Sequence, residues 1–234
     1  MNIRSRHGSL WLDPKWEAAL GRRTSVEEIL SFVQSHWRDV QKGPAPEMGP
    51  SDHEPKITKR FRLWLNKGKS RHGISGYFIA EDEVGNLDVD TGKVSDAGRT
   101  DIAYVSDRID PPLKIVFEFK KLKPQGKDVR REYCGSGVAR FVQGVYSRDD
   151  DIAFMVGMVK KQADGPLILD ALKRALQDSN MISLQRIILN STEGAVTISD
   201  KSFNECDFET QHARDHLKDC PDILLGHFLL FHEQ

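Results

Sequence analysis

Residues 114–122 read Lys-Ile-Val-Phe-Glu-Phe-Lys-Lys-Leu, and Glu118 and Lys120 place an acid and a lysine within a stretch that otherwise has the pattern of a buried strand. The alternation predicts a buried β-strand, and residues two apart on a strand point to the same face. Glu118 and Lys120 are therefore expected on one face, with Phe117 and Phe119 on the other. Burying a carboxylate and an ammonium costs several kcal/mol per ion unless something compensates. We interpret the pair as part of a site for a metal ion and a phosphate group, which would compensate both charges.

A second acid is predicted to lie beside this pair. Residues 99–105, Arg-Thr-Asp-Ile-Ala-Tyr-Val, predict a short strand with Asp101 near its start. Residues 106–112 end in Asp-Pro-Pro and predict the turn that joins the two strands. The strands would form an antiparallel hairpin, so Asp101 at the start of one and Glu118 near the end of the other would lie at the same end.

This arrangement of Asp101, Glu118 and Lys120 resembles the PD-(D/E)xK nuclease superfamily, which has the restriction-endonuclease-like fold. Thr100 stands where the proline that gives the superfamily its name would be. The resemblance covers about residues 54–160 and implies an α/β protein with a restriction-endonuclease-like core, a central mixed sheet flanked by helices.

The segments after the hairpin agree with that fold. Apolar residues at helical spacing predict a helix at residues 133–146, and residues 151–159 predict a buried strand. Strand, strand, helix, strand is the core order of the restriction-endonuclease-like fold.

The resemblance implies a site for Mg²⁺ or Mn²⁺. Asp101, Glu118 and the backbone carbonyl of Phe119 would bind the metal ion. Lys120 would orient or deprotonate the attacking water, or stabilise charge that grows on the phosphate. Glu54 would be a further metal-binding acid on the first core helix. Alternatively, its carboxylate only interacts favourably with the positive end of the dipole of that helix.

Two polar residues of the predicted 133–146 helix resemble a glutamine–tyrosine pair of some branches of the superfamily. Gln143 and Tyr146 are three residues apart, whereas four is the usual spacing. We expect them to support the metal ligands from behind, and the alternative is an ordinary position on the helix surface.

The function that the resemblance implies is a metal-dependent endonuclease that hydrolyses phosphodiester bonds in DNA. It would act as the effector of a prokaryotic restriction or anti-phage defence system, with other subunits of that system as partners. A homo-oligomer is left open. The alternative is a non-catalytic nuclease-fold subunit that binds nucleic acid or scaffolds a larger complex, with the acids kept in a polar network.

Basic residues flank the predicted site in sequence. Residues 56–71 contain seven Lys or Arg and no acid, and residues 56–65 predict an amphipathic helix with a basic outer face. Such clusters suit contacts to a nucleic-acid backbone, whereas the alternative is a solvated charged face. The residues that we expect to contact nucleic acid are Lys56, Lys59, Arg60, Arg62, Lys67, Lys121 and Lys123.

Composition limits the class of protein. The chain has 234 residues, a net charge of −1 and 38% hydrophobic residues, which is enough for a hydrophobic core. Three cysteines are too few for a disulfide framework, and no apolar run has the length of a membrane span, so we expect a cytoplasmic protein without membrane contact. We divide the chain into an N-terminal helical extension, residues 1–48, and a nuclease-like α/β domain, residues 49–234.

The C-terminal region offers a competing metal site, formed by Cys206, His212, His216 and Cys220. The two histidines would stand one helical turn apart and Cys220 another turn on, so the group could ligate zinc, although it matches no usual finger spacing. The alternative is a helix with exposed histidines and two ordinary half-buried cysteines.

The remaining elements follow from periodicity and from Pro and Gly positions. They are helices at 13–40 and 166–177, strands at 74–79, 187–189, 195–198 and 223–231, and a hairpin or extended loop at 81–96.

Overall fold

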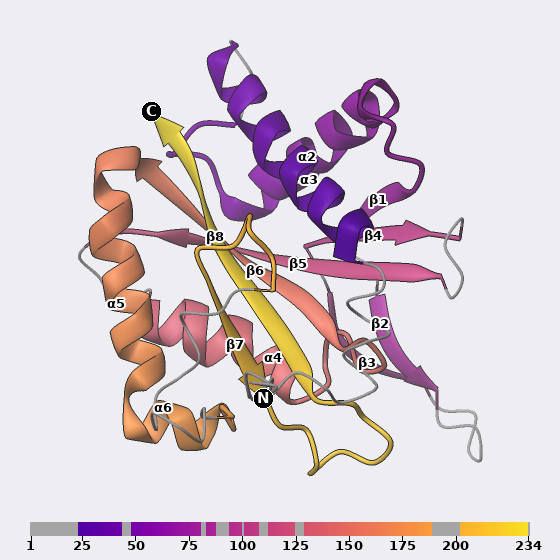
Figure 1. Cartoon of the computed structure of the whole chain (residues 1–234), viewed down its shortest axis with the longest axis vertical. Helices are drawn as coiled ribbons and strands as arrows, with labels where there is room; N and C mark the ends of the chain where they lie inside the picture. The colour runs from indigo at the N-terminus through magenta and orange to yellow at the C-terminus, as the bar shows by residue number, and fades with distance from the viewer. Residues whose placement is uncertain are drawn as a thin grey trace, which may run out of the picture.

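A mixed β-sheet forms the centre of the computed structural model, which describes residues 23–43, 48–80, 83–87, 94–99, 101–107, 112–124, 129–188 and 202–233 (Figure 1). The sheet has six strands in the order β1-β4-β5-β6-β8-β7. Their bounds are β1 Tyr77–Ala80, β4 Ile102–Ser106, β5 Leu113–Leu122, β6 Ile152–Lys161, β7 Phe208–His212 and β8 Ile223–Glu233. Strands β5, β6 and β8 are parallel neighbours, and β1, β4 and β7 pair antiparallel.

Helices cover both faces of this sheet. Helices α2 (Arg23–Lys42) and α3 (Glu54–Gly68) lie on one face. The other face carries the π-helical segment η2 (Val129–Val138) and the helices α4 (Ala139–Val142), α5 (Gly165–Gln177) and α6 (Ser179–Leu184). The prediction of an α/β protein with a central mixed sheet flanked by helices is therefore confirmed.

Alternation along the strands produces two separate apolar layers. Phe117 and Phe119 of β5 pack in the layer that includes α2 and α3, whereas Val116 of the same strand packs in the layer that includes η2 and α5. Because both faces of the central strands are covered, β6 and β8 are buried almost throughout.

Helix α2, which falls in the predicted N-terminal extension, shares the core of the sheet. Trp37 is fully buried, contacts Phe61 of α3 edge to face, and donates from Nε1 to the Phe231 carbonyl of β8 at 2.8 Å. The described residues on either side of residue 48 therefore contribute to one hydrophobic core.

Most predicted elements have counterparts in the structure. The strands at 74–79 and 223–231 and the helix at 166–177 correspond to β1, β8 and α5. The acidic segment at 81–96 contains the strands β2 (Glu83–Leu87) and β3 (Val94–Arg99), which pair as an antiparallel ribbon separate from the main sheet. Two short 3-10 helices, η1 (Lys69–His72) and η3 (Gln162–Asp164), complete the described elements.

The predicted helix at residues 133–146 differs from the structure. It begins earlier, has a π-helical first part, and α4 ends at Val142 before Gly144, whose φ is 67°. A side chain at Gly137 would place its Cβ 2.5 Å from Met155 of β6, so this segment lies too close to the sheet for a larger residue unless the Met155 side chain moves.

Several predicted features lie wholly or partly outside the described residues, among them parts of the 106–112 turn and of the 81–96 segment. The first part of the 13–40 helix, Thr100, and the strand at 195–198 also lie outside them. Of the predicted strand at 187–189, Ile187 makes an isolated bridge with His212. In the described part of the chain, no helix combines the length and the apolar character needed to cross a membrane.

Candidate active site

The antiparallel pair of β4 and β5 brings the two predicted acids together. Ile102 is paired with Phe117, so the next position along this register sets Asp101 beside Glu118. The backbone N–H of Phe119 donates to Asp101 Oδ2 at 2.8 Å. The prediction that Asp101 and Glu118 lie at the same end of an antiparallel pair is confirmed.

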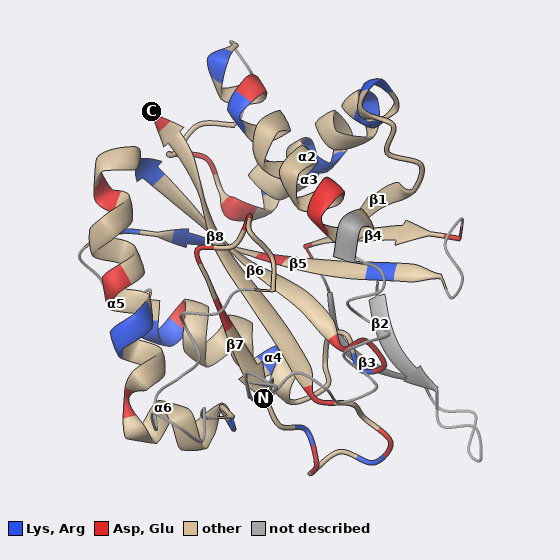
Figure 2. Ribbon diagram, in the orientation of Figure 1, with Lys and Arg blue, Asp and Glu red and all other residues tan. Residues whose placement is uncertain are grey.

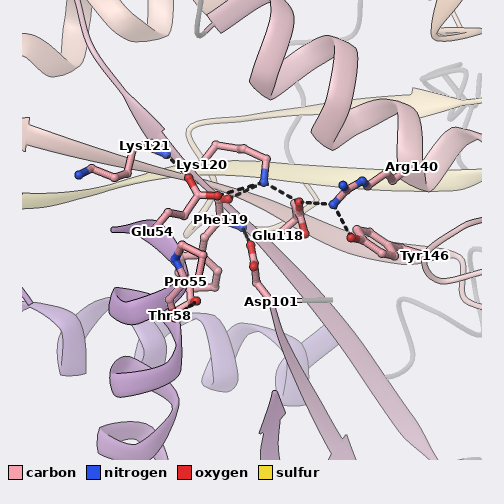
Figure 3. A network of polar contacts seen from close by, with 10 residues as sticks. All are labelled: Glu54, Pro55, Thr58, Asp101, Glu118, Phe119, Lys120, Lys121, Arg140 and Tyr146. Atoms are coloured by element: carbon pink, nitrogen blue, oxygen red, sulfur yellow. Dashed lines mark hydrogen bonds and ion pairs between the residues drawn. The ribbon is translucent and has the colours of Figure 1, made fainter. Parts of the chain in front are cut away.

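Glu118 and Lys120 share the face of β5 opposite Phe117 and Phe119, as the alternation predicts. Lys120 Nζ donates to Glu118 Oε1 at 2.6 Å and to the Phe119 carbonyl at 2.9 Å (Figure 3). Glu118 is 1% exposed and Lys120 is 9% exposed. The two residues thus form a buried ion pair. Removing both charges from water costs free energy unless their remaining polar atoms also have hydrogen-bond partners or a metal ion.

Glu54 joins this cluster from the first turn of α3. Its Oε1 lies 3.3 Å from Lys120 Nζ, and its Oε2 accepts the backbone N–H of Lys121 at 2.8 Å. Pro55 follows it in the first turn, where a missing N–H costs nothing. The carboxylate therefore fixes the start of α3 to β5, and its position at the helix N-terminus is also the one that the dipole favours.

Arg140 is a member of the cluster that the sequence analysis missed. Its NH1 lies 3.4 Å from Glu118 Oε1 and donates to the Tyr146 hydroxyl at 2.5 Å. Tyr146 is therefore linked to Glu118 through Arg140, whereas Gln143 is exposed at the end of α4 and is not brought to the acids. The sequence contained one indication of this role: Arg140 lies next to the apolar stripe of the predicted 133–146 helix, which packs on the strand that carries Glu118.

The acids of the cluster have unusual proton affinities. Burial, together with the negative charge of Glu118, raises the pKa of Asp101 to about 7, against the charge of Lys120. Burial also raises the pKa of Glu118, again against Lys120. Burial alone would lower the pKa of Lys120, but the charges of Glu118, Glu54 and Asp101 together raise it above its ordinary value. The lysine therefore stays protonated, and the carboxylates favour any further cation.

One buried oxygen of the cluster fits a metal ion. Glu118 Oε2 is buried and has no hydrogen-bond partner among the described residues. The Asp101 carboxylate, Glu118 Oε2 and the Phe119 carbonyl are oxygen donors of the hard kind that Mg²⁺ and Mn²⁺ prefer. Within the described ranges, no three His, Cys, Asp or Glu side chains form a ready metal-holding group, and Lys120 Nζ lies between Glu118 and Glu54.

No family profile, no curated protein and no solved structure matches the chain significantly. The interpretation of this site therefore depends on its geometry and on the likeness of its motif.

The predicted nucleic-acid contacts have different surroundings in the structure. On α3, Lys56, Lys59 and Lys67 are exposed, and Arg60 and Arg62 are half-buried. Figure 2 colours the Lys and Arg positions of this helix blue. The buried face of this helix consists of Ile57, Thr58, Phe61 and Leu65, whereas the apolar side chains of Leu63 and Trp64 are 54% and 36% exposed.

The two predicted basic contacts on β5 also differ. Lys121 Nζ donates to the carbonyls of Pro50 and Asp52 at 2.6 and 2.7 Å, so it ties the loop before α3 to the strand. Lys123 is exposed just beyond the end of β5.

The four residues proposed for zinc do not form a zinc site. His212 lies on strand β7 rather than on a helix, and its Nδ1 and Nε2 contact the Gln185 carbonyl at 2.7 Å and Thr210 Oγ1 at 2.8 Å. Cys220 Sγ donates to the Arg148 carbonyl at 2.8 Å. Burial lowers the pKa of His212 to about 4, so this histidine is a neutral core residue.

Proposed function

We propose that this protein is a metal-dependent nuclease that hydrolyses phosphodiester bonds in DNA. The observation that carries the proposal is the buried Glu118 Oε2, which has no hydrogen-bond partner among the described residues. A second acid, Asp101, lies beside Glu118, so the two carboxylates together attract a cation. Leaving a buried carboxylate oxygen unsatisfied costs free energy, and a divalent cation would remove that cost.

Each residue of the cluster has a separate role in this proposal. Asp101, Glu118 and the carbonyl of Phe119 would hold Mg²⁺ or Mn²⁺, with Glu54 as a further acid at the edge of the site. When bound, the metal ion would supply Lewis-acid activation of the phosphate and of water.

Lys120 would stabilise negative charge on the phosphate. Its raised pKa keeps the ammonium protonated, so a donor role is favoured over a role as general base. Arg140 NH1, which contacts Glu118 Oε1, would hold that carboxylate in place, and its side chain is 43% exposed and could also reach a phosphate.

The order of elements around the site supports a restriction-endonuclease-like core. The hairpin of β4 and β5 is followed by the helical segment η2–α4 and then by β6, parallel to β5. We extend the proposal, from the motif's resemblance, to an effector of a prokaryotic restriction or anti-phage defence system in the cytoplasm.

One observation favours the non-catalytic alternative. Lys120 Nζ already contacts Glu118, Glu54 and the Phe119 carbonyl, so most of the cluster is paired without a metal ion. In that case the cluster is an internal ion network, and the protein binds nucleic acid or scaffolds a complex without cutting.

Cleavage and metal binding together distinguish the two functions. Wild type and Glu118→Gln would be incubated with plasmid, linear duplex and single-stranded DNA in Mg²⁺, Mn²⁺ or EDTA, with Glu132→Gln as a control because Glu132 is 40% exposed and pairs with Arg131. We expect metal-dependent cleavage by wild type and the control, and none by Glu118→Gln. Metal ions should also raise the melting temperature of wild type more than that of Glu118→Gln. Absence of both effects in wild type would reject the nuclease proposal.

A further inference from the structure

A cavity of about 550 Å³ opens beside the candidate active site, at the carboxyl-terminal ends of the parallel strands β5, β6 and β8. The arrowheads of these strands point to the side of the molecule where α5 begins (Figure 1). This end of parallel strands is where open α/β sheets usually bind ligands, and the volume suits a small ligand.

The cavity has apolar walls. They include Leu122 at the end of β5, Met158 on β6 and Leu167 on α5. Leu167 is 63% exposed, so its side chain is accessible to a ligand. A flat apolar group such as a nucleobase could be held against these walls.

The rim of the cavity carries excess positive charge. Lys121, Lys123 and Lys160 line it, and Asp164 is the one acid among the described residues that do so. Figure 2 shows blue segments, which mark Lys and Arg, near the ends of β5 and β6. Lys123 and Lys160 are exposed, and the Nζ of Lys160 lies 3.9 Å from Glu233, at the limit of an ion pair. A ligand with a phosphate group would match this charge.

The largely buried side chain of His232 forms part of the wall. The ring is 8% exposed, its Nδ1 lies 3.0 Å from the Met48 carbonyl, and Nε2 is buried without a hydrogen-bond partner among the described residues. With Nδ1 donating to that carbonyl, Nε2 is an acceptor.

The cavity is continuous in sequence with the cluster of acids. Lys121, which lines it, directly follows Lys120, and its backbone N–H donates to Glu54 Oε2 at 2.8 Å. Leu122 lies two residues beyond Lys120 on the same strand, which is about 7 Å along the chain. A phosphate at Lys120 and a nucleotide in the cavity are therefore close enough to belong to one strand.

We propose that this cavity binds an unpaired nucleotide, with its base between Leu122, Met158 and Leu167 and its phosphate against Lys123 and Lys160. A base stacked and paired in a duplex cannot enter a concave pocket without being flipped out, so the proposal predicts a preference for single-stranded nucleic acid. The identification of the nucleotide as part of the substrate rests on the proposed nuclease function, whereas a free nucleotide would have the same chemistry.

Binding measured in EDTA tests this proposal without cleavage. A labelled single-stranded oligonucleotide, the same sequence as a duplex, and AMP and CMP would be titrated into wild type, into the double variant Lys123→Glu/Lys160→Glu, and into Leu167→Asp. Lys161→Glu is the matched control, because Lys161 is exposed next to Lys160 but does not line the cavity. All of these substitutions are at exposed side chains, which limits their effect on folding.

We expect the single strand to bind at least about tenfold more tightly than the duplex, and the double variant and Leu167→Asp to lose at least about tenfold of that affinity, a difference that two charge reversals or one buried carboxylate readily supplies. The control should bind as wild type does. Binding of AMP or CMP with the same loss in the variants would support the pocket and assign it to free nucleotides as well, and binding of the strand alone would assign it to the substrate.

Equal binding of duplex and single strand, or unchanged binding by both cavity variants, would overturn the proposal. The outcome is independent of the nuclease proposal. A wild type that binds the single strand through this cavity but never cleaves would reject the nuclease function and leave the nucleotide pocket in place.

Discussion

Replacing Asp101 with asparagine is expected to stabilise the protein at neutral and basic pH. The pKa of this carboxyl is raised from 3.8 to about 7, first by burial and then by the charge of Glu118. Between these two pH values the folded state keeps a proton that the unfolded state has lost, so wild type loses stability as pH rises. Asparagine has no proton to lose, and its side-chain oxygen can still accept the N–H of Phe119.

The size of the effect follows from the pKa shift. At about 1.4 kcal/mol for each unit, the gain of Asp101→Asn is near zero below pH 4, about 2 kcal/mol at pH 5.5, and about 4 kcal/mol at pH 8, where it no longer grows. A gain of this size is a large part of the stability of a typical domain.

Urea unfolding in EDTA, followed by circular dichroism across this pH range, would measure the difference. Asp107→Asn is the matched control, because Asp107 is exposed just after the other end of β4. Adding Mg²⁺ should then stabilise wild type and narrow the gap, since the metal ion binds the charged carboxylate. Equal stability of wild type and Asp101→Asn at pH 8, or a gap that does not change with pH, would refute the reasoning.

Three further predictions follow from the structure. Lys120→Met should abolish cleavage but retain metal binding, measured by calorimetry, because an ammonium is not a metal ligand. Loss of both would show instead that Lys120 holds the two carboxylates in position. Replacing the exposed Lys56, Lys59 and Lys67 with Glu should weaken binding to all DNA sequences alike. The slope of log affinity against log salt concentration should fall by about one unit for each phosphate that is no longer neutralised. Unchanged binding would mean that this face of α3 is only solvated. Thr210→Val should lower the free energy of unfolding by about 1 to 3 kcal/mol, because two buried histidine nitrogens lose their partner, and Thr210→Ser should restore most of it; a neutral Thr210→Val would show that these nitrogens find another partner.

Local periodicity was enough to predict the strands and the faces of their side chains. The alternation of Phe117, Glu118, Phe119 and Lys120 separates the two faces of β5 in any sheet, because successive side chains of a strand point in opposite directions. The turn residues before Leu113 and the acid at Asp101 were enough to predict an antiparallel hairpin and the end of it at which the acids meet.

Predictions from the sequence were wrong where one local pattern is compatible with two structures. His212 and His216 are spaced as on one face of a helix, but His212 belongs to β7, where pairing with β8 decides the conformation. Leu63 and Trp64 are apolar residues within an amphipathic helix, yet Leu63 lies opposite the buried face of α3 and Trp64 lies at the edge of that face.

The tertiary structure alone decided which distant residues meet. Glu54 is 66 residues from Lys120, and Arg140 is 22 residues from Glu118, and both reach the cluster because α3 and α4 lie on particular sides of β5. The pocket of Leu122, Met158 and His232 exists because β5, β6 and β8 end side by side. Strand order and helix placement are set by the burial of the whole apolar surface at once, which no short stretch of sequence contains.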